Sequence, residues 1–313
     1  MHILACTDHR FVIPTGVMIR SVCVNNKNID IVFHVIVDDS VSYKDKSKIS
    51  KVLGFNHKIH YYNVNVSSLN IKLPVVAERF PVSIYYRLLM TRFLPQSIDK
   101  ILYMDADIIV RGRLDDLWKI NLNGKAFGAV LNQSNANNYW ERLNYDKNLG
   151  YINSGVLLVN LKYWREAHVT ERFLKYIKDN SNVLIYPDQD VLNSVLKGER
   201  ILLHERYNLQ EAFLKKKWND MAVKNSKQME EAIDNPCVVH YTGIKPWQLG
   251  CNHPLKKLYY FYKEQTSWKY NLSMEIRIFL NIKKFINHIR FIIDLRKDEN
   301  NQYRNVNLKY GIH

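Results

Sequence analysis

Short apolar runs alternate with amphipathic stretches along the first 170 residues of the chain. The apolar runs that predict strands are His2–Cys6, Ile31–Val37, Lys58–Tyr62, Lys100–Met104, Phe127–Leu131 and Gly155–Asn160. The stretches that predict helices between them include Pro14–Asn25, Tyr43–Leu53 and Ile84–Phe93. Strands that alternate with helices indicate an α/β fold, with a mostly parallel sheet covered by helices on both faces. Such sheets bind their ligands beyond the carboxyl ends of the strands.

The last part of the chain has a different pattern. Residues 161–240 read as helices with loops, whereas from 256 onward the chain becomes basic and amphipathic. A helical stripe of apolar side chains with basic residues beside it is predicted over residues 275–296; its members are Ile278, Ile282, Phe285, Ile286, Ile289, Ile292 and Ile293. We therefore predict a main domain over residues 1–255 and a basic helical C-terminal region over residues 256–313. That helix either packs on the main domain or lies on an anionic membrane surface.

Composition narrows the class of protein. An apolar share of 47% in 313 residues indicates a packed globular protein. The four cysteines show no CxxC spacing, so we expect reduced thiols. The sequence contains neither a secretory signal pattern nor a run of about 20 apolar residues, so we expect a cytoplasmic protein, with peripheral contact to the inner face of the membrane through the C-terminal helix. The net charge of +15 favours an anionic partner.

The pair of aspartates in Asp105-Ala106-Asp107 is the strongest chemical signal. It separates the apolar runs Ile101–Met104 and Ile108–Val110. Unpaired carboxylates are costly to bury, so two of them beside a strand need a reason. On extended backbone they would point to the same face, where they could hold a hard divalent cation. A cation with only two protein ligands keeps positions open for a diphosphate, which suggests a nucleotide enzyme.

Four other segments add polar groups at predicted element ends. Tyr151-Ile152-Asn153-Ser154-Gly155 places an amide and a small-residue turn before a strand. Pro187-Asp188-Gln189-Asp190 begins a helix, whose first amides favour anions. His240-Tyr241-Thr242-Gly243-Ile244-Lys245-Pro246-Trp247 sets an imidazole five residues before an amine, and Tyr85-Tyr86-Arg87 precedes the Asp-x-Asp strand. Together these motifs resemble the family 8 retaining glycosyltransferases, which include bacterial lipopolysaccharide galactosyl- and glucosyltransferases and glycogenin.

The resemblance covers Ile3 to about Trp247 and implies a GT-A fold, a UDP-sugar donor and a manganese ion, with Mg²⁺ as the alternative cation. It implies that Asp105, Asp107 and His240 are the metal ligands, a set that Mn²⁺ tolerates. A turn role for Asp105 and a core role for His240 are the structural alternatives. The implied nucleotide contacts are Thr7, Asp8, Arg87, Asp105, Ala106, Gly243 and Lys245.

The resemblance also implies a donor-sugar pocket formed by Asn153, Asp188 and Gln189. Asp188 would accept a sugar hydroxyl and Gln189 would lie against the anomeric carbon, so these two and Lys245 are the predicted catalytic residues. Lys245 would neutralise the leaving diphosphate. Asp190 has a structural alternative, in which it accepts hydrogen bonds from free amides at a helix start. Related galactosyltransferases carry an aspartate where this chain has Asn132, so the acceptor is not inherited.

For several of these residues a structural role competes with the functional one. Asp8 would equally suit a turn after a strand, Arg87 a helix-surface ion pair, and Lys245 a solvated surface. Because an amide is a poor nucleophile, we expect front-face transfer with retention rather than a double displacement through Gln189. We predict a hexosyltransferase that moves galactose or glucose from a UDP-hexose to a saccharide or lipid-linked saccharide, in lipopolysaccharide or other surface glycan synthesis.

Two other classes of function remain as alternatives. The positive charge would suit a nucleic-acid-binding protein without transferase activity, but the sequence has no zinc-finger, RNP-like or helix-turn-helix signature, so no nucleic-acid partner is expected. A phosphoryl-transfer enzyme would use a carboxylate pair too, but the chain has no Gly-rich phosphate loop and no second carboxylate cluster.

Overall fold

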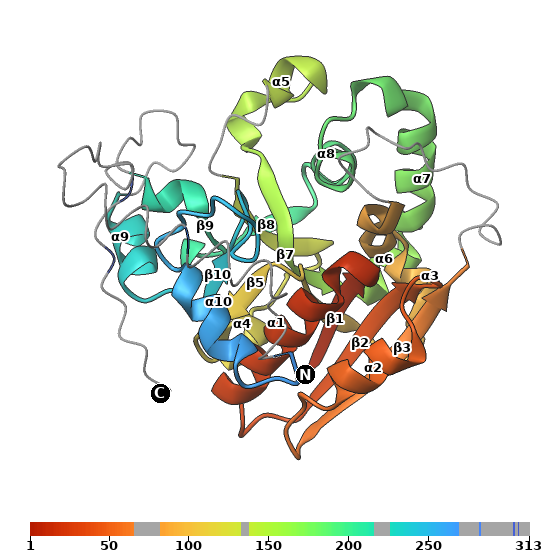
Figure 1. Ribbon diagram of the computed structural model, residues 1–313. Coiled ribbons are helices and arrows are strands. Elements are labelled where there is room, and N and C mark those ends of the chain that lie inside the picture. Colours follow the sequence, from red (N-terminus) through yellow and green to blue (C-terminus); the bar gives the residue numbers. More distant parts are fainter. Residues whose placement is uncertain are drawn as a thin grey trace.

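The computed structural model describes residues 1–65, 82–132, 138–215 and 226–268, together with residues 282, 303 and 306. Within these residues the central sheet has seven strands, which Figure 1 shows running through the middle of the molecule. Their order across the sheet is β3 (His57–Val64), β2 (Ile31–Asp38), β1 (His2–Thr7), β4 (Lys100–Met104), β7 (Ile152–Asn160), β6 (Phe127–Leu131) and β8 (Arg200–Leu202).

The sheet is mixed and mostly parallel. β1 pairs in parallel with β2 and with β4, β2 with β3, and β6 with β8, whereas β7 runs antiparallel to both of its neighbours. Because β1 and β4 are parallel, with Leu4 level with Tyr103, Thr7 and Asp105 come at the same edge of the sheet. The predicted α/β architecture is therefore confirmed, and the two motif-bearing strand ends are neighbours.

Helices cover both faces of the sheet. One face packs on α1 (Val12–Asn25) and α2 (Tyr43–Ser50) through a core that includes Val22 and Phe33. The opposite core, which includes Trp164 and Phe173, is formed with α3 (Met90–Phe93), α6 (Leu161–Glu166), α7 (Val169–Asn180), α8 (Pro187–Val195) and the 3₁₀ helix η3 (Val82–Leu89).

A second, three-stranded sheet lies beside the first. Its order is β5 (Ile108–Val110), β10 (Val238–His240) and β9 (Leu209–Gln210), with β10 antiparallel to β5 and parallel to β9. The other helices are α4 (Asp115–Lys119), α5 (Tyr139–Arg142), α9 (Ser226–Asp234), α10 (Lys256–Lys263), η1 (His9–Phe11), η4 (Lys147–Leu149), η5 (Ser181–Val183), η6 (Glu205–Tyr207) and η7 (Glu211–Leu214). Figure 1 shows α9 and α10 on the side of the molecule that carries this second sheet.

Two local predictions were wrong. Asp105-Ala106-Asp107 is not extended but forms the turn between β4 and β5, where the chain leaves one sheet for the other. Asn153, Ser154 and Gly155 are not a turn before a strand but lie inside β7, because ladder pairing extends that strand back to Ile152. The predicted helix from Ile84 to Phe93 is also divided, since it begins as η3 and becomes α3 only at Met90.

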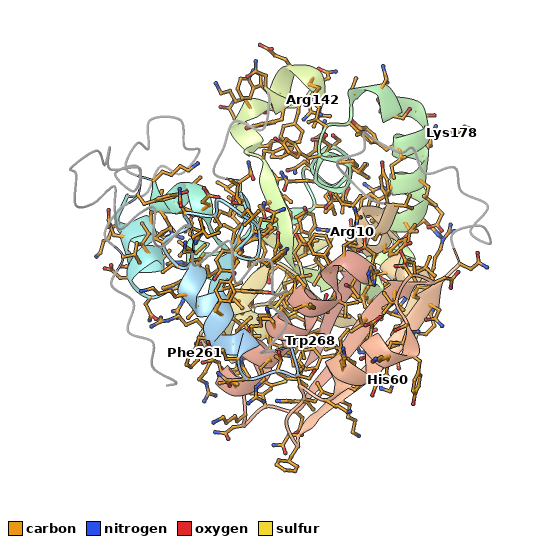
Figure 2. All side chains as sticks on the ribbon, in the orientation of Figure 1. Arg10, His60, Arg142, Lys178, Phe261 and Trp268 are labelled. Carbon is orange, nitrogen blue, oxygen red and sulfur yellow. The ribbon has the colours of Figure 1, made fainter. Side chains whose placement is uncertain are left out.

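The C-terminal region contacts the main core where it is described. Gly16 in α1 leaves room for Trp268, because a methyl group there would lie 2.3 Å from the indole ring. Figure 2 shows Trp268 beyond the end of α10, below α1. Tyr303 forms an isolated antiparallel bridge with Lys215. The domain boundary after residue 255 stays a prediction, and the helix predicted over residues 275–296 lies outside the described residues except for Ile282.

Among the described residues, no helix is both long enough and apolar enough to cross a membrane. Cys6, Cys23, Cys237 and Cys251 are all free thiols, as their spacing predicted.

Candidate active site

The turn between β4 and β5 brings Asp105 and Asp107 against His240 of β10. One ligand atom from each of the three residues lies within 4.8 Å of the others. His240 Nε2 is 3.2 Å from Asp107 Oδ1 and 3.8 Å from Asp105 Oδ2. The pairing of β10 with β5 sets this contact, because it places His240 opposite Ile108, next to Asp107. The three residues predicted as metal ligands therefore converge.

Gly155 of β7 passes directly beneath this cluster. A methyl group on its Cα would lie 2.2 Å from His240 Cε1 and 3.0 Å from Asp105 Oδ2. Only a glycine leaves that space open for the imidazole and the carboxylate. The glycine therefore has a packing reason that is specific to the site.

Asp107 is held ionised by its neighbours. Lys245 Nζ lies 2.5 Å from Asp107 Oδ2 and also donates to the Tyr241 carbonyl at 2.7 Å. Burial alone would raise the pKa of the Asp107 carboxyl, but the Lys245 ammonium and the His240 ring hold that pKa well below its usual range. Lys245 thus contacts a predicted metal ligand, and its predicted contact with a diphosphate stays a prediction.

Arg87 of η3 joins the aspartate turn to the start of α8. Its Nη2 lies 2.9 Å from Asp105 Oδ1, and its Nη1 lies 3.0 Å from Asp188 Oδ2, an ion pair whose angle falls outside hydrogen-bond geometry. Burial works against the charged guanidinium, yet the carboxylates of Asp105 and Asp188 raise the pKa of Arg87 well above its ordinary value. Tyr103 completes the arrangement, since its hydroxyl donates to Asp105 Oδ1 at 2.6 Å and its ring lies under the guanidinium. Arg87 is therefore not a surface residue but a buried bridge.

The pKa of Asp188 shifts in the opposite direction from that of Asp107. Burial raises the pKa of its carboxyl, and the nearby Asp105 adds to this shift, while Arg87 opposes it. Asp188 and Gln189 lie in the first turn of α8, as the sequence predicted for a helix beginning at Pro187.

Buried amides connect Gln189 to the metal-ligand cluster. Gln189 Oε1 accepts from the Ser154 N–H at 3.1 Å and from Asn153 Nδ2 at 3.2 Å. Asn153 Nδ2 also lies 3.4 Å from Asn132 Oδ1. Asn132, which stands where related galactosyltransferases carry an aspartate, therefore borders the same network. Asn208, which no sequence motif singled out, continues the network from Asn153 to His240.

Asp190 has the structural role that the sequence analysis gave as its alternative, which is to accept hydrogen bonds from free amides at a helix start. Its carboxylate accepts from the amides of Ile185 and Tyr186 at 2.8 and 2.9 Å, just before α8. It also accepts from Tyr151 and from both terminal nitrogens of Arg142. Figure 2 shows Arg142 on α5 at the top of the molecule. Asp190 therefore fixes the helix start that presents Gln189.

Thr7, Asp8 and Ala106 are buried around the same sheet edge. Asp8 accepts from the Arg10 amide at 2.9 Å and from the Ser83 hydroxyl at 3.0 Å, which ties the end of β1 to η3. The predicted turn alternative for Asp8 is thus present, and nucleoside binding by Thr7, Asp8 and Ala106 stays a prediction. Gly243 lies against Glu211. A methyl group on Gly243 would lie only 1.7 Å from the Oε2 atom of Glu211.

The structure also brings in residues that the sequence analysis missed. The sequence pattern could have identified Tyr103, because alternation along the predicted strand Lys100–Met104, continued by one residue, would place it on the same face as Asp105. Asn208 had none, because a single asparagine before a two-residue strand has no local pattern.

The comparisons with known proteins identify the family of the chain. Residues 2–250 match Glycosyl transferase family 8. The chain is 31% identical over 288 residues to the lipopolysaccharide 1,2-glucosyltransferase of Escherichia coli K12, covering 90% of this chain and 83% of that protein. It is 24% identical over 278 residues to the lipopolysaccharide 1,3-galactosyltransferase of Salmonella typhimurium, covering 84% and 77%.

Among solved structures, the galactosyltransferase LgtC with donor and acceptor sugar analogs superposes with a TM-score of 0.76 at 24% identity, covering 88% of this chain and 99% of LgtC. This likeness confirms the GT-A fold. The family match does not favour the nucleic-acid-binding alternative. The chain belongs to glycosyl transferase family 8 and is therefore a glycosyltransferase, the class of enzyme that its motifs predicted.

Proposed function

We propose that the chain transfers a hexose, galactose or glucose, from a UDP-sugar to a saccharide acceptor, with retention of configuration and with the help of a divalent cation. The observation that carries the proposal is the convergence of Asp105, Asp107 and His240 beside Lys245 and the Asp188-Gln189 helix start. Residues that could hold a cation, a lysine that could neutralise a diphosphate and polar groups that could bind a sugar thus lie at one edge of the sheet.

The residues present fit a divalent cation. Two carboxylates and one imidazole suit Mn²⁺ better than Mg²⁺, which prefers oxygen ligands. The space kept by Gly155 supports this assignment, because a Cβ would fill the place where His240 and Asp105 approach each other. A bound cation would act as a Lewis acid toward the diphosphate.

The side chains of this chain account for the rest of the leaving-group chemistry. Lys245 lies at the cluster, where an ammonium would neutralise charge that develops as UDP leaves. Arg87 and Tyr103 hold Asp105 in place. Asp188, beside Arg87, would accept a hydroxyl of the donor sugar and so orient the ring.

The environment of Gln189 supports a front-face route. Its Oε1 is already engaged by the Ser154 amide and by Asn153, so this oxygen is not a free nucleophile for a double displacement. Asp190 is fully buried and its carboxylate accepts several hydrogen bonds, which removes it as a substitute. In the front-face route the acceptor oxygen bonds to the anomeric carbon as the bond to the diphosphate breaks, and the acceptor proton passes to the departing phosphate oxygen.

Our proposal for the acceptor and for the cellular location of the reaction is based on the similar proteins. Two of them are lipopolysaccharide glycosyltransferases, so we propose a saccharide or lipid-linked saccharide acceptor in surface glycan synthesis, met at the inner face of the cytoplasmic membrane. The donor, galactose or glucose, differs between these relatives in name and is left to experiment.

The test is UDP release from UDP-galactose, UDP-glucose and other UDP-sugars, each with Mn²⁺, with Mg²⁺ and with EDTA, followed by mass spectrometry of the products. We expect release from one UDP-hexose, strongest with Mn²⁺ and abolished by EDTA. Release that is unaffected by EDTA would contradict the metal site. Absence of both release and Mn²⁺-dependent UDP binding would contradict the proposed donor.

A further inference from the structure

Asn208 lies fully buried between the strand that carries Asn153 and the strand that carries His240. It follows η6 and immediately precedes β9, the neighbour of β10 in the small sheet. Its Nδ2 is 2.8 Å from Asn153 Oδ1, and its Oδ1 is 2.9 Å from His240 Nδ1. A side chain without access to water needs both ends of its amide satisfied, and these two contacts do so.

The direction of these hydrogen bonds follows from a backbone group. The Gly155 N–H donates to the side chain of Asn153 at 3.0 Å, and a backbone N–H can only donate, so the atom that it meets is the amide oxygen. The atom of Asn208 facing that oxygen must then be its NH₂ group. The other end of Asn208, which faces His240, is therefore the oxygen.

The same reasoning shows which ring nitrogen of His240 carries the hydrogen. An amide oxygen can only accept, so His240 Nδ1 must carry a hydrogen. Nε2 is then the ring nitrogen that can offer a lone pair, and it is the one that faces Asp107 and Asp105. The backbone amide of Gly155 thus fixes, through Asn153 and Asn208, which nitrogen of His240 is available to a metal.

We propose that Asn208 is a positioning residue that holds the ring of His240 with Nδ1–H as donor and Nε2 toward the metal. This inference rests on the proposed metal site. Histidine ligands commonly donate their second N–H to an oxygen, and loss of that partner typically weakens metal binding about 10- to 100-fold. Because Asn153 also contacts Gln189, the same amides connect the metal ligand to the proposed sugar pocket.

The first experiment is calorimetric titration of Mn²⁺ into the full chain without donor. We expect Asn208→Ala to weaken binding about 10- to 100-fold, because it removes the oxygen that accepts from Nδ1–H. The matched control is Asn26→Ala, which removes another buried asparagine, whose hydrogen bonds to Val22 and to the Leu114 amide involve no residue of the proposed site. It should lower the melting temperature without changing the affinity for Mn²⁺.

Two outcomes would overturn the proposal. One is an Asn208→Ala variant that binds Mn²⁺ as tightly as the wild type. The other is an NMR spectrum of the metal-free, ¹⁵N-histidine-labelled chain that shows no slowly exchanging Nδ1–H on His240. We expect that signal in the wild type and its loss in Asn208→Ala. Failure of the wild type to bind Mn²⁺ while the NMR signal is present would instead reject the proposed metal site.

Discussion

At the scale of the residue, the surroundings of a carboxylate decide its charge. Asp107 and Asp188 are both buried beside the same cluster, yet their pKa values move in opposite directions. Burial penalises ionisation of both. Asp107 faces two basic side chains, Lys245 and His240, whereas Asp188 faces one guanidinium that it shares with Asp105. The two basic neighbours thus lower the pKa of Asp107, whereas the one shared guanidinium does not offset the effect of burial on the pKa of Asp188.

Asp107→Asn is expected to lower UDP release more than about 100-fold, because it removes a charge that would bind the proposed cation and that pairs with Lys245. The fold should persist with a modest loss in melting temperature. Since the folded pKa is lowered, the stability that Asp107 contributes is present above about pH 4 and is lost as pH falls below it. The melting temperatures of wild type and variant should therefore converge in acid, as followed by circular dichroism.

The control for this variant is Asp116→Asn, which neutralises an exposed aspartate on α4. It should leave UDP release unchanged. Near-normal turnover of Asp107→Asn would show that the metal assignment is wrong.

Gly155→Ala adds one methyl group beneath the cluster. Because that methyl would lie 2.2 Å from His240 Cε1, the ring must move, and we expect Mn²⁺ affinity and UDP release to fall at least about tenfold. Gly198→Ala is the matched control, since a methyl there meets no atom of the described chain within 4 Å. Equal Mn²⁺ affinity of the two variants, measured by calorimetry, would contradict the packing argument.

At the scale of the element, the site depends on where α8 begins. Pro187 occupies the first turn, which needs no N–H, and the free amides before the helix are satisfied by Asp190. Arg142 of α5 and Tyr151 complete the hydrogen bonds of that carboxylate. The start of α8 is thus fixed in position before any ligand arrives, and Gln189, which precedes Asp190 in that first turn, is fixed with it.

Asp190→Asn breaks this buried ion pair and leaves the guanidinium of Arg142 only partly compensated. We expect the free energy of unfolding to fall by about 3 kcal/mol, as measured by urea denaturation. Asp179→Asn is the control, because it breaks an exposed ion pair with Lys175 on α7 and should cost at most about 0.5 kcal/mol. Similar losses in the two variants would contradict the anchoring role of Asp190.

At the scale of the whole molecule, the basic C-terminal region is the part for which we propose a membrane contact. The chain carries a net charge of +15, and residues from Lys215 onward hold 18 Lys and Arg against 9 Asp and Glu. Within it, α10 and Trp268 pack into the core with α1, and Tyr303 and Val306 pack against the core cluster of α10. A membrane contact would therefore have to come from other residues of this region.

Flotation with anionic liposomes should separate the full chain from a 1–270 truncation, which retains α10 and Trp268. We expect the full chain to float and the truncation to remain in the dense fraction, because the basic amphipathic stripe over residues 275–296 is removed. Neutral liposomes and the melting temperature of the truncation serve as controls. Equal flotation of the two proteins would end the membrane hypothesis.

The local sequence pattern predicted most strands of the large sheet and the residue types that each motif contributes. Alternation of apolar runs with amphipathic stretches predicted β1, β4 and β6 almost to the residue, because burial of one or both faces of a strand leaves a local pattern. Asp105 and Asp107 are also neighbours in sequence, so their convergence required only a local turn, although the sequence pattern predicted extended backbone there.

How these motifs meet depends on strand pairing across the whole fold. His240 reaches Asp107 because β10 pairs antiparallel with β5, and Asn208 reaches His240 because β9 lies on the other side of β10. Such pairings join segments far apart in the chain, and their register depends on packing of the whole core rather than on any local pattern. The sequence therefore predicted most of the residues that converge at this edge of the sheet, whereas the assembled sheets added Tyr103 and Asn208 and set which side chains contact one another.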